Sequence, residues 1–159
     1  MSGASTQSAG GATAIDIAPQ HRPGWMRALR FVRGAAHWLH LVLAAAVVLG
    51  VFLQVYLIGA YIFGAGQGAL DAHKSMGWTV HGFEMLVFLA ALVAWLPCVD
   101  LILSLLLAVI GTVQVTLASE HRWIGGLHPL LALVVAGLAA ALALRAIRRR
   151  RDTRLLRSS

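Results

Sequence analysis

Long apolar stretches alternate with short polar segments along the chain, and the pattern repeats four times. The apolar stretches cover about residues 35–63, 76–97, 101–118 and 124–144, and each holds at most one charged residue. Each has roughly the 20 residues that a helix needs to cross the hydrocarbon core of a bilayer. None alternates as a strand would, and backbone groups in lipid must be bonded within their own segment. The sequence therefore predicts an all-α integral membrane protein, a four-transmembrane-helix bundle.

The positive charges are distributed unevenly around these spans. Of 13 Lys and Arg residues, two lie beside the outer loops, Lys74 and Arg122. The others precede the first span or follow the last: Arg22, Arg27, Arg30, Arg33, Arg145, Arg148, Arg149, Arg150, Arg151, Arg154 and Arg157. The positive-inside rule then predicts that both termini are cytoplasmic. The net charge of +7 indicates orientation and contact with anionic lipid rather than nucleic acid, because no aromatic or groove-reading motif accompanies the basic tail.

Composition and length predict one membrane domain with two tails. Hydrophobic residues make up 59% of the 159 positions and charged residues 12%, which is too apolar for an ordinary soluble surface. We expect a disordered cytoplasmic tail at 1–22, the membrane domain at 23–148 and a basic cytoplasmic tail at 149–159. Residues 23–33 either lie on the membrane surface or extend the first helix. The single cysteine, Cys98, excludes an internal disulfide and a cysteine-rich metal site.

Six of the seven histidines lie in or at the ends of the apolar segments. They are His37, His40, His73, His81, His121 and His128. A neutral imidazole in hydrocarbon needs partners for a donor and an acceptor, so such a group indicates a bound metal or haem, or a proton path. The predicted topology places His37 and His40 near the cytoplasmic face and the other four toward the outer face.

The outer histidines form two ladders of similar length. His73 and His81 are eight residues apart, about 12 Å along a helix, and His121 and His128 are seven apart, about 10 to 11 Å. Since the second and fourth spans run in the same direction, we expect His81 to face His128 and His73 to lie near His121. Two imidazoles on facing helices can bind haem iron axially. His81 and His128 are therefore the predicted haem ligands, and His73 either caps a propionate or replaces His81 if its helix extends outward.

Three further polar residues fall at a similar depth. Glu84 shares a helix face with His81, and Gln54 and Gln114 lie in the outer half of their spans. Glu84 is expected to be protonated or paired with an imidazole, as an orienting or proton-handling group. The two glutamines either belong to the cofactor-binding cluster or form plain hydrogen bonds between helices.

Two other groups of residues leave alternatives open. In the outer loops, Asp71, His73, Glu120 and His121 either bind zinc or copper as a secondary metal site or form a solvated, salt-bridged surface with the neighbouring Lys74 and Arg122. At the inner face, His40 is a candidate for haem, quinone or headgroup contact. No other inner histidine completes a second bis-histidine site with His37 and His40, so one haem is favoured over two.

The stretch LDAHKSMGWTVH, with His73 and His81, together with His40 in the first span and His128 in GGLHPL, resembles a small bacterial four-span membrane family of unknown function. The resemblance covers roughly residues 35–148. More distantly, the layout is similar to membrane b-type cytochromes and to one half of haem A synthase. This resemblance implies haem b, and electron transfer to or from quinone.

Two hypotheses follow from different classes. The first is an electron-transfer membrane cytochrome in the bacterial inner membrane, acting by itself or as an accessory subunit of a larger respiratory or redox complex rather than as a stand-alone enzyme. The second is a haem-free structural or accessory subunit, or a transporter in which Glu84 and the histidines carry protons or metal ions. Haem content separates the two hypotheses.

Overall fold

The protein is a bundle of long helices. The computed structural model describes residues 24–118 and 122–158, and every regular element in that part of the chain is helical. The elements are α1 (Gly24–Ile62), α2 (Gln67–Val93), α3 (Cys98–Leu117), the short α4 (Arg122–Gly125) and α5 (Leu127–Ser158). The expected tail at 1–22 lies outside the described residues.

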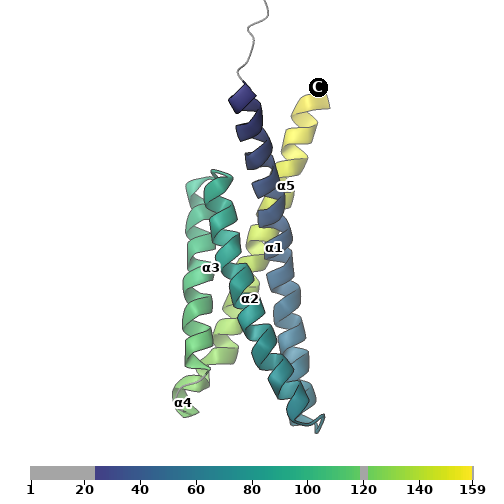
Figure 1. Ribbon diagram of the computed structural model, residues 1–159, viewed down its shortest axis with the longest axis vertical. Coiled ribbons are helices and arrows are strands. Elements are labelled where there is room, and N and C mark those ends of the chain that lie inside the picture. The colour runs from purple at the N-terminus through teal and green to yellow at the C-terminus, as the bar shows by residue number, and fades with distance from the viewer. Residues whose placement is uncertain (1–23, 119–121, 159) are drawn as a thin grey trace, which may run out of the picture.

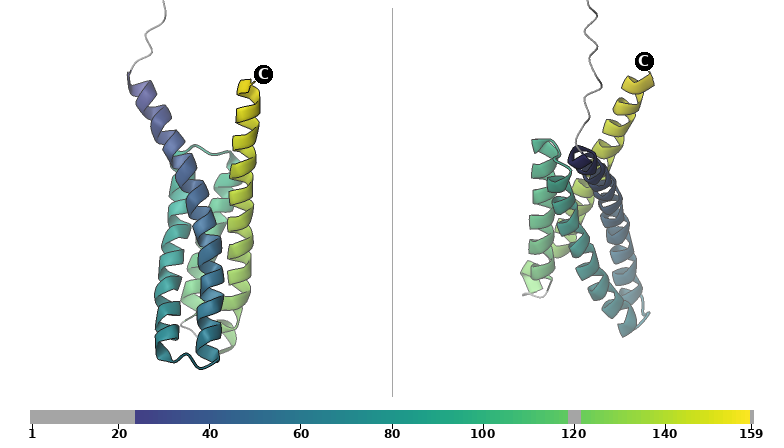
Figure 2. Two further views of the ribbon diagram at one scale, coloured as in Figure 1. Left: turned by 90° about the vertical axis from the view of Figure 1, so that its right-hand side faces the viewer. Right: turned by 45° about the horizontal axis from the view of Figure 1, so that its top comes forward.

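The four long helices run up and down in sequence order (Figure 1). α1 packs against α2 and α5, and α3 packs against the same two helices. The bundle is therefore square in cross-section, with α2 and α5 diagonal to each other. The α2–α3 turn lies toward the same end of the bundle as the start of α1 and the end of α5, and both of those helices continue past the turn (Figure 2).

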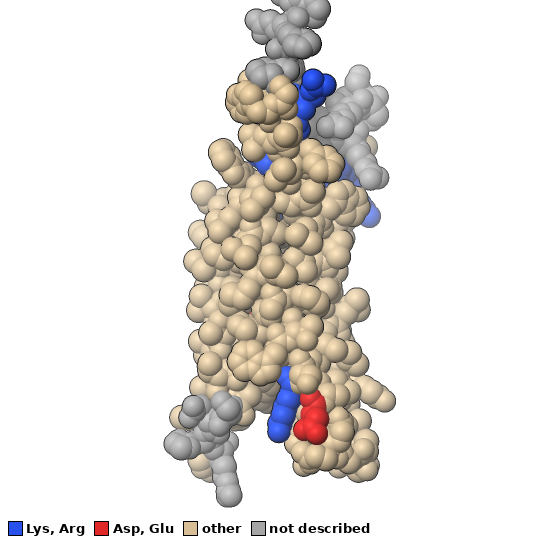
Figure 3. Space-filling view, viewed as in Figure 1, with Lys and Arg blue, Asp and Glu red and all other residues tan. Residues whose placement is uncertain are grey.

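The surface of the bundle is apolar. Four helices are long and apolar enough to cross a membrane: Gly24–Ile62, Gln67–Val93, Cys98–Leu117 and Trp123–Asp152. On the face drawn in Figure 3, Lys, Arg, Asp and Glu gather at the two ends and leave the middle uncharged. Large side chains such as Phe52 and Leu133 are more than half exposed there, as expected for residues that face lipid. The prediction of a multi-pass, all-α membrane protein agrees with this architecture.

The turn between α1 and α2 and the turn between α2 and α3 are of the same type. At the end of α1, Gly64 N–H donates to Tyr61 O and Ala65 N–H to Ala60 O, with Gly64 at φ 94°. At the end of α2, Trp95 takes the place of that glycine at φ 54° and makes the equivalent bonds. This is the Schellman arrangement, which requires a left-handed residue after the helix. This left-handed conformation is unfavourable for a residue with a side chain, as at Trp95. The centre of the Trp95 ring lies 5.3 Å from the guanidinium carbon of Arg33, a cation–π contact.

The helices begin and end differently from the apolar stretches. α1 continues unbroken from Gly24, so residues 24–33 extend the first helix in a described length of 39 residues. α2 begins at Gln67, nine residues before the predicted span, and α5 continues through the basic segment to Ser158. The early start of α2 matters most, because it places His73 on a helix inside the bundle.

Candidate functional site

His73 and His128 meet at the end of the bundle opposite the termini. Their ring centres are 6.2 Å apart, and the ring planes are inclined by 75°. His73 lies on α2 and His128 on α5, so the pair spans the diagonal of the square. His81 was the first partner expected for His128, and His73 the alternative if its helix extended outward. The ring described beside His128 is that of His73, on the part of α2 that precedes the predicted span.

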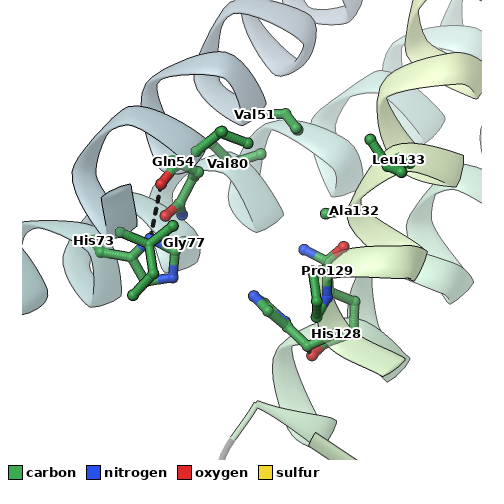
Figure 4. A pocket seen from close by; sticks show the side chains of 12 residues that line it. Val51, Gln54, His73, Gly77, Val80, His128, Pro129, Ala132 and Leu133 are labelled. Atoms are coloured by element: carbon green, nitrogen blue, oxygen red, sulfur yellow. Dashed lines mark hydrogen bonds between the residues drawn. The ribbon is translucent and has the colours of Figure 1, made fainter. Parts of the chain in front are cut away.

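Backbone carbonyls fix the orientation of both rings. The Nδ1 atom of His73 lies 3.1 Å from the carbonyl oxygen of Gln54, and that of His128 lies 3.0 Å from the carbonyl oxygen of Gln114. A carbonyl oxygen only accepts, so each Nδ1 carries the proton and donates it. Each Nε2 atom therefore keeps its lone pair, which is the form that binds a metal. In Figure 4 a nitrogen of each ring is directed toward the other ring.

A cavity of about 230 Å³ adjoins the two imidazoles (Figure 4). All four long helices contribute to its walls, and most of the walls are aliphatic. Val55 of α1 and Leu133 of α5 also line the cavity, and both are more than half exposed on the outside of the bundle. The cavity is therefore apolar and borders the lipid-facing surface between α1 and α5.

Two amide oxygens in the cavity wall have no hydrogen-bond partner among the described residues. They are Oε1 of Gln54 on α1 and Oε1 of Gln114 on α3. Buried amide oxygens normally have a partner, because burial without one costs about 1–3 kcal/mol. Each long helix thus directs one polar side chain to the cavity: Gln54, His73, Gln114 and His128.

His81 and Glu84 form a separate pair on the next turns of α2. The His81 Nδ1 atom lies 3.0 Å from Oε2 of Glu84, whose side chain is 1% exposed. The carboxyl group lies against Gly111 of α3, where a Cβ atom would overlap it. The expected pairing of Glu84 with an imidazole is present, and it is with His81. His81 also contacts the ring of Trp78.

No described contact joins His37 or His40 to a histidine of another helix. His40 is buried, and its Nε2 atom lies 3.2 Å from the hydroxyl oxygen of Ser104 on α3. His37 is half-buried one turn earlier. This arrangement gives His40 a neutral hydrogen-bond partner and no second imidazole.

Of the outer-loop residues, Asp71 and Lys74 are exposed at the start of α2. Glu120 and His121 lie outside the described residues, as does the expected contact of His73 with His121. Within the described part of the chain, no group of three or more His, Cys, Asp or Glu side chains is arranged to hold a metal ion.

Sequence reasoning missed a buried acid at the end of the bundle that carries the termini. Asp100, in the first turn of α3, is fully buried. Arg145 Nε donates to its Oδ1 at 2.6 Å, and Arg149 Nη1 donates to its Oδ2. The signal was the four-residue spacing of the two arginines, which places both on one face of α5.

A second missed signal is a short repeat. The segments 54–57 (QVYL) and 114–117 (QVTL) occupy similar positions near the outer ends of α1 and α3. Each begins with the glutamine whose carbonyl accepts from a cavity histidine. The α1–α2 and α3–α5 hairpins thus present their imidazoles in the same way.

Comparison of the chain with protein-family models, curated proteins and solved structures found no match.

Proposed function

We propose that the protein is a membrane b-type cytochrome-like protein that binds one haem b and transfers electrons. His73 and His128 would hold the iron from opposite sides. The observation that carries this proposal is the separation of the two ring centres, 6.2 Å, with each Nδ1 atom bonded elsewhere. His128 was expected as a ligand from the sequence, and His73 takes the place first given to His81.

The separation matches two axial ligands on one metal. A metal–imidazole nitrogen bond is about 2 Å. The centre of a five-membered ring with bonds of about 1.35 Å lies a further 1.1 Å or so from the nitrogen. Two imidazoles on opposite sides of one ion therefore have ring centres about 6.2 Å apart. The His73–His128 separation has this value.

The expected distance between the two ring centres differs between a haem and a tetrahedral metal site. Two imidazoles on a tetrahedral zinc ion would have their ring centres only about 5 Å apart. The ring centres of His73 and His128 are farther apart than that, and a porphyrin would supply the remaining donors to an iron held by these two residues. The distance thus supports haem more than zinc.

The surroundings of the pair also support a haem. The cavity walls are largely aliphatic, which suits a porphyrin, and the Gln54 and Gln114 amides supply polar atoms beside it. Val55 and Leu133 in the cavity wall are exposed, so the cavity borders lipid between α1 and α5. A bound haem supplies a reversible one-electron carrier. The chain's part is to fix both imidazoles through the Gln54 and Gln114 carbonyls and to cover the site with apolar helices.

We expect the electron donor and acceptor of the proposed haem to lie in the membrane. The site lies next to a lipid-facing surface, so quinone in the membrane or a partner subunit of a larger redox complex can exchange electrons with it. With arginines concentrated at the end that carries both termini, the proposed location is the bacterial inner membrane, with both termini in the cytoplasm and the haem toward the outer face.

Absorption spectra of four purified proteins test this proposal. The wild type should be red, with a Soret band and a sharpened α band on dithionite reduction. His73→Ala and His128→Ala should each lose haem or its low-spin spectrum. His81→Ala is the matched control, a histidine on the same helix as His73, and should keep the spectrum. A colourless wild type with no haem extractable into pyridine would rule the proposal out and favour a haem-free accessory or transport role. Loss of the spectrum in His81→Ala and His128→Ala, but not in His73→Ala, would restore the ligand pair expected from sequence.

A further inference from the structure

An arginine of α5 stacks on a tryptophan of α1 at the end of the bundle that carries the termini. The guanidinium carbon of Arg150 lies 3.4 Å from the centre of the Trp38 ring. The Trp38 side chain is 55% exposed, and Arg150 is half-buried. The stack therefore lies at the surface of the bundle, where α1 packs against α5, and the ring holds the guanidinium in place there.

Positive charge is concentrated around this stack. His37 on α1 lies within electrostatic range of Arg33, Arg149 and Arg150, so these three arginines come close to one side chain. The carboxylate of Asp100 is shared between Arg149 and a second arginine of α5, and it offsets only one of those two charges. Like charges near a partly buried surface repel one another, and an anion bound among them lowers the repulsion.

Next to the stack, the surface between α1 and α5 becomes apolar toward the middle of the bundle. Val42 follows Trp38 by one turn of α1, and Ile147 precedes Arg150 by about one turn of α5, so each lies on the same helix face as its partner. Both aliphatic side chains are exposed. This order of cation and then aliphatic surface matches a phospholipid, whose phosphate lies at the membrane interface and whose acyl chains lie in the hydrocarbon.

We propose that an anionic phospholipid of the adjacent leaflet binds beside the Trp38–Arg150 stack, with its phosphate on the guanidinium and its acyl chains along Val42 and Ile147. A guanidinium presents its N–H donors as a planar fork, which binds two phosphate oxygens with parallel hydrogen bonds. Because the lipid contacts both α1 and α5, its binding stabilises the packing of these helices. The site lies at the other end of the bundle from the two cavity imidazoles, so it does not depend on the proposed haem.

Lipid titrations of the purified full chain in a non-ionic detergent test this proposal. Phosphatidylglycerol should raise the thermal unfolding midpoint of the wild type, whereas phosphatidylcholine and inorganic phosphate at the same concentration should not. The apparent Kd for phosphatidylglycerol, measured by native mass spectrometry, should rise about tenfold or more in Arg150→Gln, because hydrogen bonds to a charged group are lost.

Arg148→Gln is the matched control. It removes the same charge from an exposed position of α5, two residues away and therefore on another face of the helix. With a screening length of about 8 Å at physiological salt, its Kd should change by less than about twofold. Each Kd comes from lipid binding to one variant, so a variant that is itself less stable still gives a result.

Two further variants separate a built site from attraction by net charge. Arg150→Lys keeps the charge but not the planar fork, and Trp38→Leu removes the ring beneath it. Both should raise the Kd at least about threefold. Wild-type affinity in both variants, or equal affinities for Arg148→Gln and Arg150→Gln, overturns the proposal. Equal stabilisation of the wild type by phosphatidylcholine or by inorganic phosphate also overturns it, since the ligand is then not an anionic lipid.

Discussion

The acceptor available to Nδ1 distinguishes the outer histidines from one another. His73 and His128 donate to backbone carbonyls, which are fixed by their helices and carry no net charge. His81 instead contacts a carboxyl group on its own helix. A carbonyl oxygen only accepts, so it fixes the proton of the ring on Nδ1, whereas a carboxyl group either accepts from Nδ1 or, when protonated, donates to it. The surroundings thus fix the tautomer of His73 and His128 but not that of His81.

Asp100 is the residue on which the inner end of the bundle depends. Replacing it by Asn keeps its shape but removes the charge that Arg145 and Arg149 contact. Hydrogen bonds to charged groups contribute about 1.5–3 kcal/mol each, and both arginines are about one-third exposed or more, so we expect a loss of stability near the lower end of that range. Thermal unfolding in detergent should show a lower midpoint.

Asp71→Asn is the control for that measurement, since Asp71 is exposed and should unfold at the wild-type temperature. Equal midpoints for Asp100→Asn and the wild type would show that the ion pairs with α5 do not stabilise the bundle.

For single residues, the sequence showed which side chains are candidates for the site, but it was less informative about which side chains contact one another. Glu84 and His81 were expected to share a helix face, and three-residue spacing guarantees it. His81 was the first partner expected for His128, and His73 was the alternative if its helix extended outward. Hydropathy alone did not decide between them, because the helical start at Gln67 lies in a polar segment that hydropathy assigns to a loop. The burial of Asp100 was not predicted, because it lies between two apolar stretches and nothing in the local pattern reveals that α5 covers it.

Close contact between α1 and α2 requires a residue without a side chain at Gly50. A Cβ atom there would overlap the Val80 side chain, and Val80 is itself buried. Gly50→Ala should therefore push the two helices apart and destabilise the protein by about 1–3 kcal/mol. Because Val80 also lines the cavity, the same change should weaken ligand binding there. Unfolding in detergent, read by circular dichroism, measures the first effect.

Gly59→Ala is a matched control on the same helix, because a Cβ atom there meets nothing within 4 Å. It should leave stability unchanged or slightly raised. Adding Val80→Ala to Gly50→Ala should recover part of the loss, as expected for residues in direct contact. A Gly50→Ala protein as stable as Gly59→Ala would contradict the packing described for α1 and α2.

The elements themselves were largely predictable. Four apolar stretches gave four long helices, because in lipid a helix is the only way for a single segment to satisfy its own backbone. The ends of the helices were not predictable from hydropathy. The helices α1 and α5 continue into arginine-rich segments, and the hydropathy pattern does not register the helical propensity of arginine.

For the molecule as a whole, the arrangement of the helices predicts which end of the bundle is cytoplasmic. The α2–α3 turn lies toward the end of the bundle that carries the chain termini, and positive charge there predicts that this end is cytoplasmic. Cys98, exposed beside that turn, should therefore not react with a membrane-impermeant maleimide in intact cells, but should react after permeabilisation.

A cysteine at the opposite end gives the complementary result. In a Cys98→Ser background, Ala65→Cys in the exposed α1–α2 loop should react in intact cells. The reverse pattern would show that the termini are outside, and would place the His73–His128 site toward the cytoplasm.

The proposal of one haem rests on the single pair of facing imidazoles found among the described residues. The ring centres of His73 and His128 are 6.2 Å apart, whereas His40 bonds to Ser104. The haem-to-protein ratio of the purified wild type, from pyridine haemochrome absorbance and amino-acid analysis, measures this directly. We expect one haem b per chain. A ratio near zero would contradict the haem proposal itself, and a ratio near two would show that the inner histidines also bind one.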